Sequence, residues 1–390
     1  MASAFEKRLK RRVIGPRHGF FAVCPPGMES ICASEMAALG IPAADMAILR
    51  GGIAFEARLI QVMELNLKLG SASRILMRIS EFSASSFARF EKKISEMDWA
   101  LYLPQNPLIR FSVTLKKSRL YHSGAVSQRC EHVIRRQLGQ RLPDLSADSL
   151  EHTVYIRAED DRFVVSLDTT GELLFKRGIK QVVTAAPLRE NLAFAMLFWT
   201  QFSADDLLVD PMCGSGTFSL EAAMIQSGLP PGFFRRFAFE TWPAFSMPAF
   251  EHLKKQAAGN MRTCETPSIF ASDTDENVLA ALKQNICSTV FEPFISVQQL
   301  DFFEMDPKTV CSSRKGVILL NPPYGKRLDT PEHRPEFFAQ IRRKLLQDFK
   351  GWRVGILVPD HQSITGLNLS LRFRPVFHGG LDIVAGIGRI

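Results

Sequence analysis

The sequence predicts an α/β fold with a Rossmann-like, doubly wound sheet in the carboxyl-terminal half and an α+β region before it. Three observations support this prediction. From residue 188 onward, short apolar runs alternate with segments of helical periodicity, as in a parallel sheet covered by helices. One apolar run leads into a glycine-rich turn near 213–216, and another is followed by Asn-Pro-Pro-Tyr at 321–324. Ligands of open α/β sheets bind at the carboxyl ends of such strands, so both segments are candidate functional sites.

The first half of the chain combines helical and strand patterns. Apolar side chains recur at helical spacing from Met28 to Leu39, and Gly40 is placed to end that helix. The elements expected after it are strands at 52–56, 108–113 and 163–167 and a helix around 125–138. The segment 171–186 is interpreted as the linker to the second half.

The second half opens with a predicted helix at 188–202, followed by a strand, a turn and another helix. Gly214 and Gly216 allow the backbone to approach a ligand closely. The helix 217–226, with Gly228 as its cap, directs its amide groups toward that ligand. Small size and tight packing explain Cys213 better than a role as a nucleophile. The candidate ligand-binding residues here are Asp210, Pro211, Cys213, Gly214, Ser215, Gly216 and Thr217.

Carboxylates end the next two predicted strands. A carboxylate at the end of the second strand usually accepts ribose hydroxyl groups, so Asp273 is a candidate ribose ligand. Asp301 is placed to accept from an adenine amino group beside the ring of Phe302. Alternatively, these acids are helix N-caps, which is the preferred interpretation of Asp275. The strands are expected at 269–273 and 295–302, with a helix at 276–288 between them.

The segment 321–324 follows the apolar run 317–320. Two successive prolines cannot continue a helix or a ladder, so backbone carbonyls remain free to receive a substrate. The Asn321 amide oxygen and the Pro322 carbonyl could accept from an exocyclic NH2 group, and Tyr324 offers a flat face for a ring. The candidate catalytic residues are Asn321, Pro322, Pro323 and Tyr324. The alternative is a proline-stiffened turn. Lys326 and Arg327 either hold phosphates or form an exposed basic turn.

Composition limits the class of protein. A chain of 390 residues with 46% hydrophobic residues is long enough for two sizeable cores. Its seven cysteines include no C-x-x-C pair, so we expect no disulfide framework and no metal site. No apolar run approaches the roughly 20 residues that span a bilayer, and no apolar segment follows the basic tail 1–17. A cytoplasmic monomer without a membrane partner is expected.

Positive charge is concentrated in the first half. Residues 1–184 contain 27 Lys and Arg against 19 Asp and Glu, whereas residues 185–390 contain 21 of each. Such an excess attracts a phosphate-rich partner, while the second half needs only to accommodate one base and one cofactor. Within 110–136 the basic residues face only Glu131 and are interleaved with aromatic ones. The candidate nucleic-acid-binding residues are Arg110, Lys116, Lys117, Arg119, Arg129, Arg135 and Arg136. Their alternative is an ordinary solvated surface.

Taken with the glycine turn and the acidic strand ends, the 321–324 turn resembles that of S-adenosylmethionine-dependent methyltransferases that act on amino groups. The segments 177–180 and 186–193 resemble the part of bacterial RNA guanine-N2 methyltransferases that leads into the catalytic fold. Residues 20–29 resemble the start of the same family, and the tail 376–384 resembles the strand pair that closes methyltransferase sheets. The resemblance covers nearly the whole chain. The chain resembles the amino-terminal half of the large-subunit ribosomal RNA enzyme and its single-domain relatives, and we expect no counterpart of the second methyltransferase domain of the larger relatives.

The resemblance implies a cofactor, a substrate and a domain order. It implies S-adenosylmethionine, held also by Pro187 and Glu190, with Asp210 at its methionine portion. It implies RNA as the partner and N2-methylguanosine in 23S ribosomal RNA as the product. The implied domains are a ferredoxin-like module at 18–70, a THUMP RNA-binding domain at 71–170 and a class I methyltransferase domain at 187–390. A fragment beginning near residue 184 is therefore expected to fold alone.

Other functions share these motifs. Guanine-N2 methylation of transfer RNA and adenine-N6 methylation of RNA or DNA could use the same turn. Protein glutamine methylation also uses it, but a protein substrate would not explain the positive charge of the first half. A non-catalytic RNA-binding factor could retain the fold, although the intact turn and glycine loop argue against that function.

Overall fold

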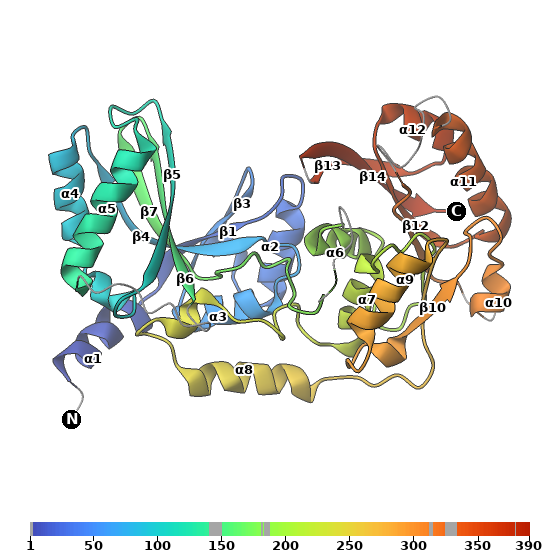
Figure 1. Cartoon of the computed structure of the whole chain (residues 1–390), viewed down its shortest axis with the longest axis horizontal. Helices are drawn as coiled ribbons and strands as arrows, with labels where there is room; N and C mark the ends of the chain where they lie inside the picture. The colour runs from blue at the N-terminus through green and yellow to red at the C-terminus, as the bar shows by residue number, and fades with distance from the viewer. Residues whose placement is uncertain are drawn as a thin grey trace. The chain divides into compact units, whose positions relative to one another are not determined.

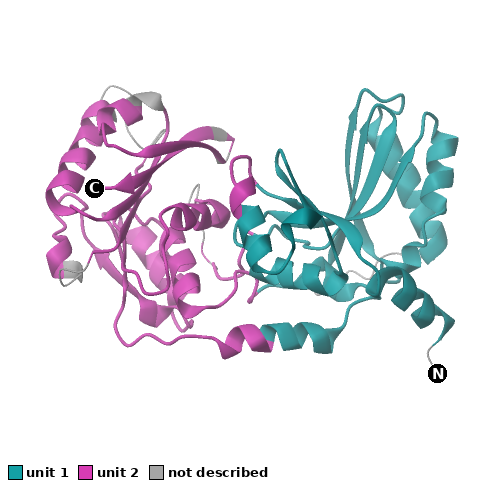
Figure 2. Ribbon diagram, turned by 180° about the vertical axis from the view of Figure 1, so that it is seen from behind, with its two compact units in different colours: residues 1–24, 32–174, 235–254 teal, residues 25–31, 175–234, 255–390 magenta. Residues whose placement is uncertain are grey.

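The computed structural model describes residues 3–139, 150–180, 182, 188–311, 315–323, 334–378 and 380–390. The chain forms two compact units (Figure 2). The first unit contains residues 1–24, 32–174 and 235–254, and the second contains residues 25–31, 175–234 and 255–390. None of the helices in the described ranges is long and apolar enough to cross a membrane.

The second unit is built on a seven-stranded sheet with the order β10-β9-β8-β11-β12-β14-β13 (Figure 1). Its strands are β8 (Leu208–Asp210), β9 (Ile269–Asp273), β10 (Ile295–Gln299), β11 (Val317–Leu320), β12 (Arg353–Val358), β13 (Arg372–His378) and β14 (Leu381–Arg389). Strands β8 to β12 are parallel, and β14 runs antiparallel to both β12 and β13. The chain moves outward from β8 to β10 on one side and from β11 to β12 on the other. The predicted doubly wound fold is confirmed, with its switch point between β8 and β11.

Both faces of this sheet are covered. On β11, Val317 and Leu319 pack into one hydrophobic cluster, and Ile318 and Leu320 pack into another. This two-sided burial explains the continuous apolar run that the sequence shows there. The helices are α6 (Glu190–Trp199), α7 (Thr217–Ser227), α9 (Glu276–Ile286), α10 (Pro307–Cys311), α11 (Arg334–Asp348) and α12 (His361–Leu367). The strand expected at 295–302 ends at Gln299, and the helix expected at 188–202 is shorter at both ends.

The first unit contains one continuous sheet with the order β2-β3-β1-β4-β7-β6-β5. Its strands are β1 (His18–Val23), β2 (Met46–Leu49), β3 (Gly52–Ala57), β4 (Arg74–Ser83), β5 (Leu108–Lys116), β6 (Glu151–Glu159) and β7 (Arg162–Asp168). Its main helices are α1 (Ala4–Leu9), α2 (Glu29–Ala38), α3 (Leu59–Lys68), α4 (Phe87–Ser95) and α5 (Ser123–Leu138). The boundary expected at residue 70 falls inside this sheet, because β1 pairs with β4 and β4 pairs with β7.

The two units exchange segments of chain. Phe237, Phe239 and Phe250, the last on α8 (Met247–Gly259), are buried in the core of the first unit. The backbone N–H of Phe239 donates to the carbonyl of Thr169 at 3.1 Å. In the other direction, the segment 25–31 supplies Met28 and Ile31 to the core of the second unit. A fragment beginning near residue 184 would leave these three aromatic rings without the core that buries them, and its independent folding stays a prediction.

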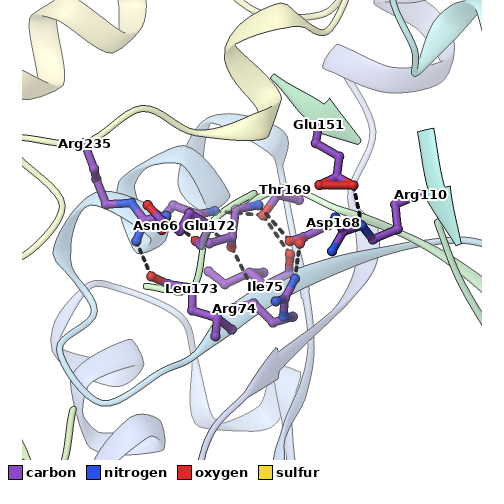
Figure 3. Close-up of polar contacts among 11 residues, drawn as sticks. Asn66, Arg74, Ile75, Arg110, Glu151, Asp168, Thr169, Glu172, Leu173 and Arg235 are labelled. Atoms are coloured by element: carbon purple, nitrogen blue, oxygen red, sulfur yellow. Dashed lines mark hydrogen bonds and ion pairs between the residues drawn. The ribbon is translucent and has the colours of Figure 1, made fainter. Parts of the chain in front are cut away.

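A buried polar network connects the end of β7 to β4 and to Arg235, which begins the segment 235–254 of the first unit (Figure 3). The Asp168 carboxylate is fully buried, forms an ion pair with Arg74 and accepts from the Thr170 backbone N–H at 2.9 Å. Asn66 donates to the Thr169 hydroxyl at 2.9 Å, and the Arg235 guanidinium donates to the Leu173 carbonyl at 2.6 Å. Burial raises the pKa of Asp168 to about 6, and the Arg74 charge opposes that shift. At neutral pH the carboxyl group is therefore ionised and paired.

Candidate active site

The glycine turn leaves β8 and enters α7 through two residues with positive φ. Gly216 has φ +75°, and a Cβ there would lie 2.3 Å from the Leu282 Cδ1 atom, so this position requires glycine. Gly214 has φ +51°, and a Cβ there would meet nothing within 4 Å. The backbone at Gly214 therefore faces open space that a ligand can occupy. The helix expected from residue 217 and its left-handed cap at Gly228 are confirmed.

Asp210 ends β8 with no exposed surface. One oxygen accepts from the Ser219 hydroxyl at 2.7 Å, and within the described chain the other has no hydrogen-bond partner. Burial raises the pKa of Asp210 to about 7, and the Ser219 hydrogen bond opposes the shift. A buried acceptor without a partner is costly, so this oxygen is suited to a donor group of a ligand. Ser219 could not be predicted from the sequence, because its contact with Asp210 depends on how α7 packs on the sheet.

Cys213 lies in the turn and does not have the properties of a nucleophile. Its side chain is buried, and burial raises the pKa of the thiol well above its usual value. Its backbone N–H donates to the Ser272 carbonyl at 3.0 Å, which fixes the turn against β9. Cys213 is thus a packing residue, as its size indicated.

Asp273 ends β9 and supports the same turn. Its Oδ2 accepts from the Gly214 backbone N–H at 2.9 Å, and its Oδ1 accepts from the Asp275 N–H at 3.1 Å. Asp275 is the N-cap of α9 and accepts from the Asn277 N–H at 2.9 Å, so the cap interpretation of Asp275 is confirmed. Asp273 is only half buried and retains acceptor capacity on both oxygens. Its binding to a ribose stays a prediction.

Replacing Asp273 by alanine is expected to weaken cofactor binding by about 1.5–3 kcal/mol, because charge-assisted hydrogen bonds are lost. Isothermal titration with S-adenosylhomocysteine measures this loss. Asp275→Ala is the matched control, since it removes a neighbouring carboxylate that caps α9 and should leave affinity nearly unchanged. Equal losses in both variants would make Asp273 a structural residue only.

Asp301 and Phe302 lie in the turn after β10. Asp301 accepts from the Phe303 backbone N–H at 2.8 Å. The Phe302 side chain is only 2% exposed, and its ring centroid lies 6.1 Å from that of Phe349 in the core. Phe302 is therefore a core residue, and no open ring face is left for stacking on a base. A hydrogen bond from an adenine amino group to Asp301 stays a prediction.

Asn321 follows β11 directly, at the same sheet edge as Asp210. The strands β8 and β11 are parallel neighbours, with Val209 opposite Ile318. The Asn321 Oδ1 atom is buried and accepts no hydrogen bond from any residue that the structure describes. Pro322 is buried and Pro323 is half buried. Tyr324, Lys326, Arg327 and Pro187 lie outside the described residues.

The segment leading into the catalytic fold is fixed to α7 by two cations. The Lys180 ammonium group lies 3.0 Å from Glu190 Oε1 and donates to the Thr217 hydroxyl at 2.7 Å. Arg177 donates to both carboxylate oxygens of Glu221, at 2.9 and 3.0 Å, in a buried pair. Glu190 and Thr217 are thus joined at the first turns of α6 and α7, beside the glycine turn. Glu221 could not be predicted from the sequence, because nothing in its spacing indicates a buried partner.

The basic residues of 110–136 are not as isolated as the sequence indicated. Glu131 is the only acid within 110–136 of the sequence, but folding brings acids from other elements to these basic residues. The ion pairs are Arg110–Glu151, Arg119–Asp161 at 3.7 Å, Arg129–Glu91 and Arg135–Glu131 at 2.8 Å. Lys116, Lys117 and Arg136 are exposed and have no acidic partner among the described residues. The free charge is therefore centred on Lys116 and Lys117, beside the 76% exposed side chain of Arg119.

The sheet is doubly wound and closes with an antiparallel strand pair. It carries a glycine turn, and acids end its first two strands. These features define a class I methyltransferase. The open space at Gly214 and the Asp210 oxygen, which has no hydrogen-bond partner in the described part of the chain, fit S-adenosylmethionine, the cofactor of that class. Residues 177–375 match the model of the RMKL-like methyltransferase domain, and residues 19–76 match that of the RlmL ferredoxin-like domain. The chain belongs to this family of S-adenosylmethionine-dependent RNA methyltransferases.

Individual relatives agree with this assignment. The chain is 32% identical to slr0064 of Synechocystis sp., an RNA methyltransferase by name, over 93% of this chain and 94% of that protein. It is 28% identical to the ribosomal RNA large subunit methyltransferase K/L of Syntrophotalea carbinolica over 93% of this chain. That match covers 52% of the relative, so the chain spans about half the length of the K/L protein. The solved structure of SMU.472 complexed with SAH superposes with a TM-score of 0.84 and 26% identity, covering 96% of this chain and 99% of that one.

Proposed function

We propose that this protein methylates the exocyclic N2 of a guanine in RNA, most specifically in 23S ribosomal RNA. The observation that carries the proposal is the buried Oδ1 atom of Asn321, which has no hydrogen-bond partner among the described residues and lies at the sheet edge where, within the same residues, an Asp210 oxygen also has none. An acceptor in that position is suited to an NH2 hydrogen of a base. The K/L relatives, by their name, act on large-subunit ribosomal RNA and support the choice of substrate.

The chemistry follows from what Asn321 and Pro322 can do. The lone pair of a guanine amine is conjugated with the ring, which makes the nitrogen a poor nucleophile. Hydrogen bonds from the amine to the Asn321 amide oxygen and the Pro322 carbonyl would hold the nitrogen in place and favour its pyramidal form. No strong base is needed, since the methylated cationic nitrogen is itself acidic.

The cofactor would be held at the same sheet edge as Asn321, but at the ends of β8 and β9. Asp210 and the backbone of the glycine turn would bind its methionine portion, and Asp273 would bind its ribose. When bound, S-adenosylmethionine supplies an electrophilic methyl group on a sulfonium. Positioning of the amine and electrostatic stabilisation therefore account for the rate, and both depend on rigid residues at strand ends.

In this proposal the first unit binds RNA through Lys116, Lys117 and Arg119. Changing all three to glutamine is expected to reduce the slope of log affinity against log salt by about 3 units, roughly one per phosphate contact. Filter binding of protein-free ribosomal RNA at several KCl concentrations measures the slope, and cofactor affinity should not change.

The matched control for this variant removes the same charge from three side chains that are all ion-paired, whereas in the test variant only Arg119 has an acidic partner, Asp161 at 3.7 Å, among the described residues. Arg110, Arg129 and Arg135 each contact a carboxylate, so their replacement by glutamine should change the slope by less than about 1 unit. If both triple variants bind RNA like the parent, the first unit is not the RNA-binding part of the protein.

A further inference from the structure

A second basic surface lies in the second unit, at the opposite end of the sheet from Asn321. A cavity of about 370 Å³ is lined by residues from the end of α6 and from the strands β12, β13 and β14. Its charged and aromatic lining residues are Arg353, Arg372, Arg374, Arg389 and Trp199. No described acidic residue lines it. Arg353 begins β12 and pairs with Arg389, so the cavity lies one strand length, about 17 Å, from the catalytic edge.

One of the four arginines already has a structural role. The Arg353 guanidinium forms an ion pair with Asp206 and donates to the Gln201 carbonyl at 2.5 Å and the Thr200 carbonyl at 3.3 Å. These carbonyls follow the last turn of α6, where backbone acceptors lack intrahelical donors. Arg353 therefore donates hydrogen bonds to the free carbonyl groups at the end of α6 and is not available to a ligand.

The other three arginines are available. Arg372, Arg374 and Arg389 are exposed, and none has an acidic partner in the part of the chain that the structure describes. The Arg374 guanidinium lies 5.5 Å from the centre of the half-buried Trp199 ring, which holds it over the cavity. Gly388 and Ser370 also line the cavity, and a Cβ at Gly388 would lie 3.2 Å from the Ser370 carbonyl oxygen and 2.7 Å from the Leu371 Cδ2 atom.

The concentration of charge in this cavity is produced by the fold. Residues 185–390 contain equal numbers of basic and acidic side chains, so the sequence gives no excess in this half. Like charges gathered without acids repel one another, and a bound anion relieves that repulsion. By contrast, the lining of a cavity of about 280 Å³ in the first unit combines Arg12 and Lys93 with Glu81, Glu96 and Asp98, which gives no preference for an anion.

We propose that Arg372, Arg374 and Arg389 bind the phosphodiester backbone of the substrate RNA, as a second contact beyond the first unit. A guanidinium donates to two phosphate oxygens at once, and arginine is more weakly hydrated than lysine. A flexible polyanion can reach this cavity and the catalytic edge together, since both lie on one sheet. The inference rests on RNA being the substrate and adds a binding site in the catalytic unit itself.

The test is a triple variant in which Arg372, Arg374 and Arg389 are changed to glutamine and Arg353 is kept. Binding of protein-free ribosomal RNA is measured across KCl concentrations, and SAH binding and thermal unfolding report on folding. The salt slope is expected to fall by about 2–3 units, with SAH affinity unchanged. The control changes Lys283, Lys308 and Arg343, which are exposed on other elements of the same unit, to glutamine, and its slope should stay close to that of the parent.

Three results would overturn the inference. If the cavity variant and the control bind RNA equally well, the cavity is not a contact. If the parent binds inorganic phosphate saturably, and the cavity variant loses that binding without a change in RNA affinity, the cavity is a small-anion site. If the parent itself binds no RNA, both the proposed substrate and this inference are wrong. This result differs from the first one, in which the parent binds RNA and only the inference is wrong.

Discussion

Asn321→Ala is expected to lower kcat for methyl transfer at least about a hundredfold, because the amide is the polar side chain proposed to position the reacting amine. SAH affinity should stay within about twofold of the parent, since the contact is made to the substrate amine and not to the cofactor. Single-turnover transfer of labelled methyl groups to RNA, together with titration of SAH, separates the two effects.

The matched control for this variant is Asn277→Ala. Asn277 lies on α9, and its described hydrogen bonds go only to Asp275 Oδ1. Its loss should leave turnover near that of the parent. Near-normal turnover of Asn321→Ala would remove Asn321 from catalysis, and a parallel loss of SAH affinity would reassign it to cofactor binding.

Asp168→Ala is expected to destabilise the first unit by about 3–5 kcal/mol, because it leaves a mostly buried Arg74 charge without its partner. It also removes the acceptor of the Thr170 backbone N–H. Hydrogen exchange at pH 7.5, followed on peptides of β4 and β7, reports on this unit separately from the second one.

Glu151→Ala is the control for Asp168→Ala. Glu151 pairs with Arg110, and the two side chains are 36% and 70% exposed, so the loss should stay below about 1 kcal/mol. Equal protection of β7 in the two variants would mean that the Asp168 network does not stabilise the first unit.

The sheet edge that carries Asp210, Asp273 and Asn321 could be predicted because its sequence signals are local. The runs ending at Asp210 and Asp273 and the run before Asn321 are short, apolar and bounded by turn residues, and each forms a parallel strand of the second unit. Gly216 and Gly228 have the left-handed conformations that their positions required. In each of these cases, the residue type and its neighbours within a few positions determine the backbone.

Contacts between distant segments could not be predicted. The pairing of Arg129 with Glu91 joins two helices. The Pro-Pro-Gly sequence at 230–232 indicates a turn, but it does not indicate that Phe237 is buried in the core of the first unit. Phe302 follows an acid at a strand end, yet its ring turns into the core beside Phe349. The arginine-lined cavity also arises only when β13, β14 and the end of α6 come together.

The central claim is the transfer of a methyl group to a guanine N2 in RNA. The direct measurement uses labelled S-adenosylmethionine and ribosomal RNA from a strain that lacks this protein, followed by digestion to nucleosides and mass spectrometry. The parent protein is expected to place the label in N2-methylguanosine, and Asn321→Ala is expected to place none. Label in N6-methyladenosine, or label found in transfer RNA or protein and not in ribosomal RNA, would contradict the account.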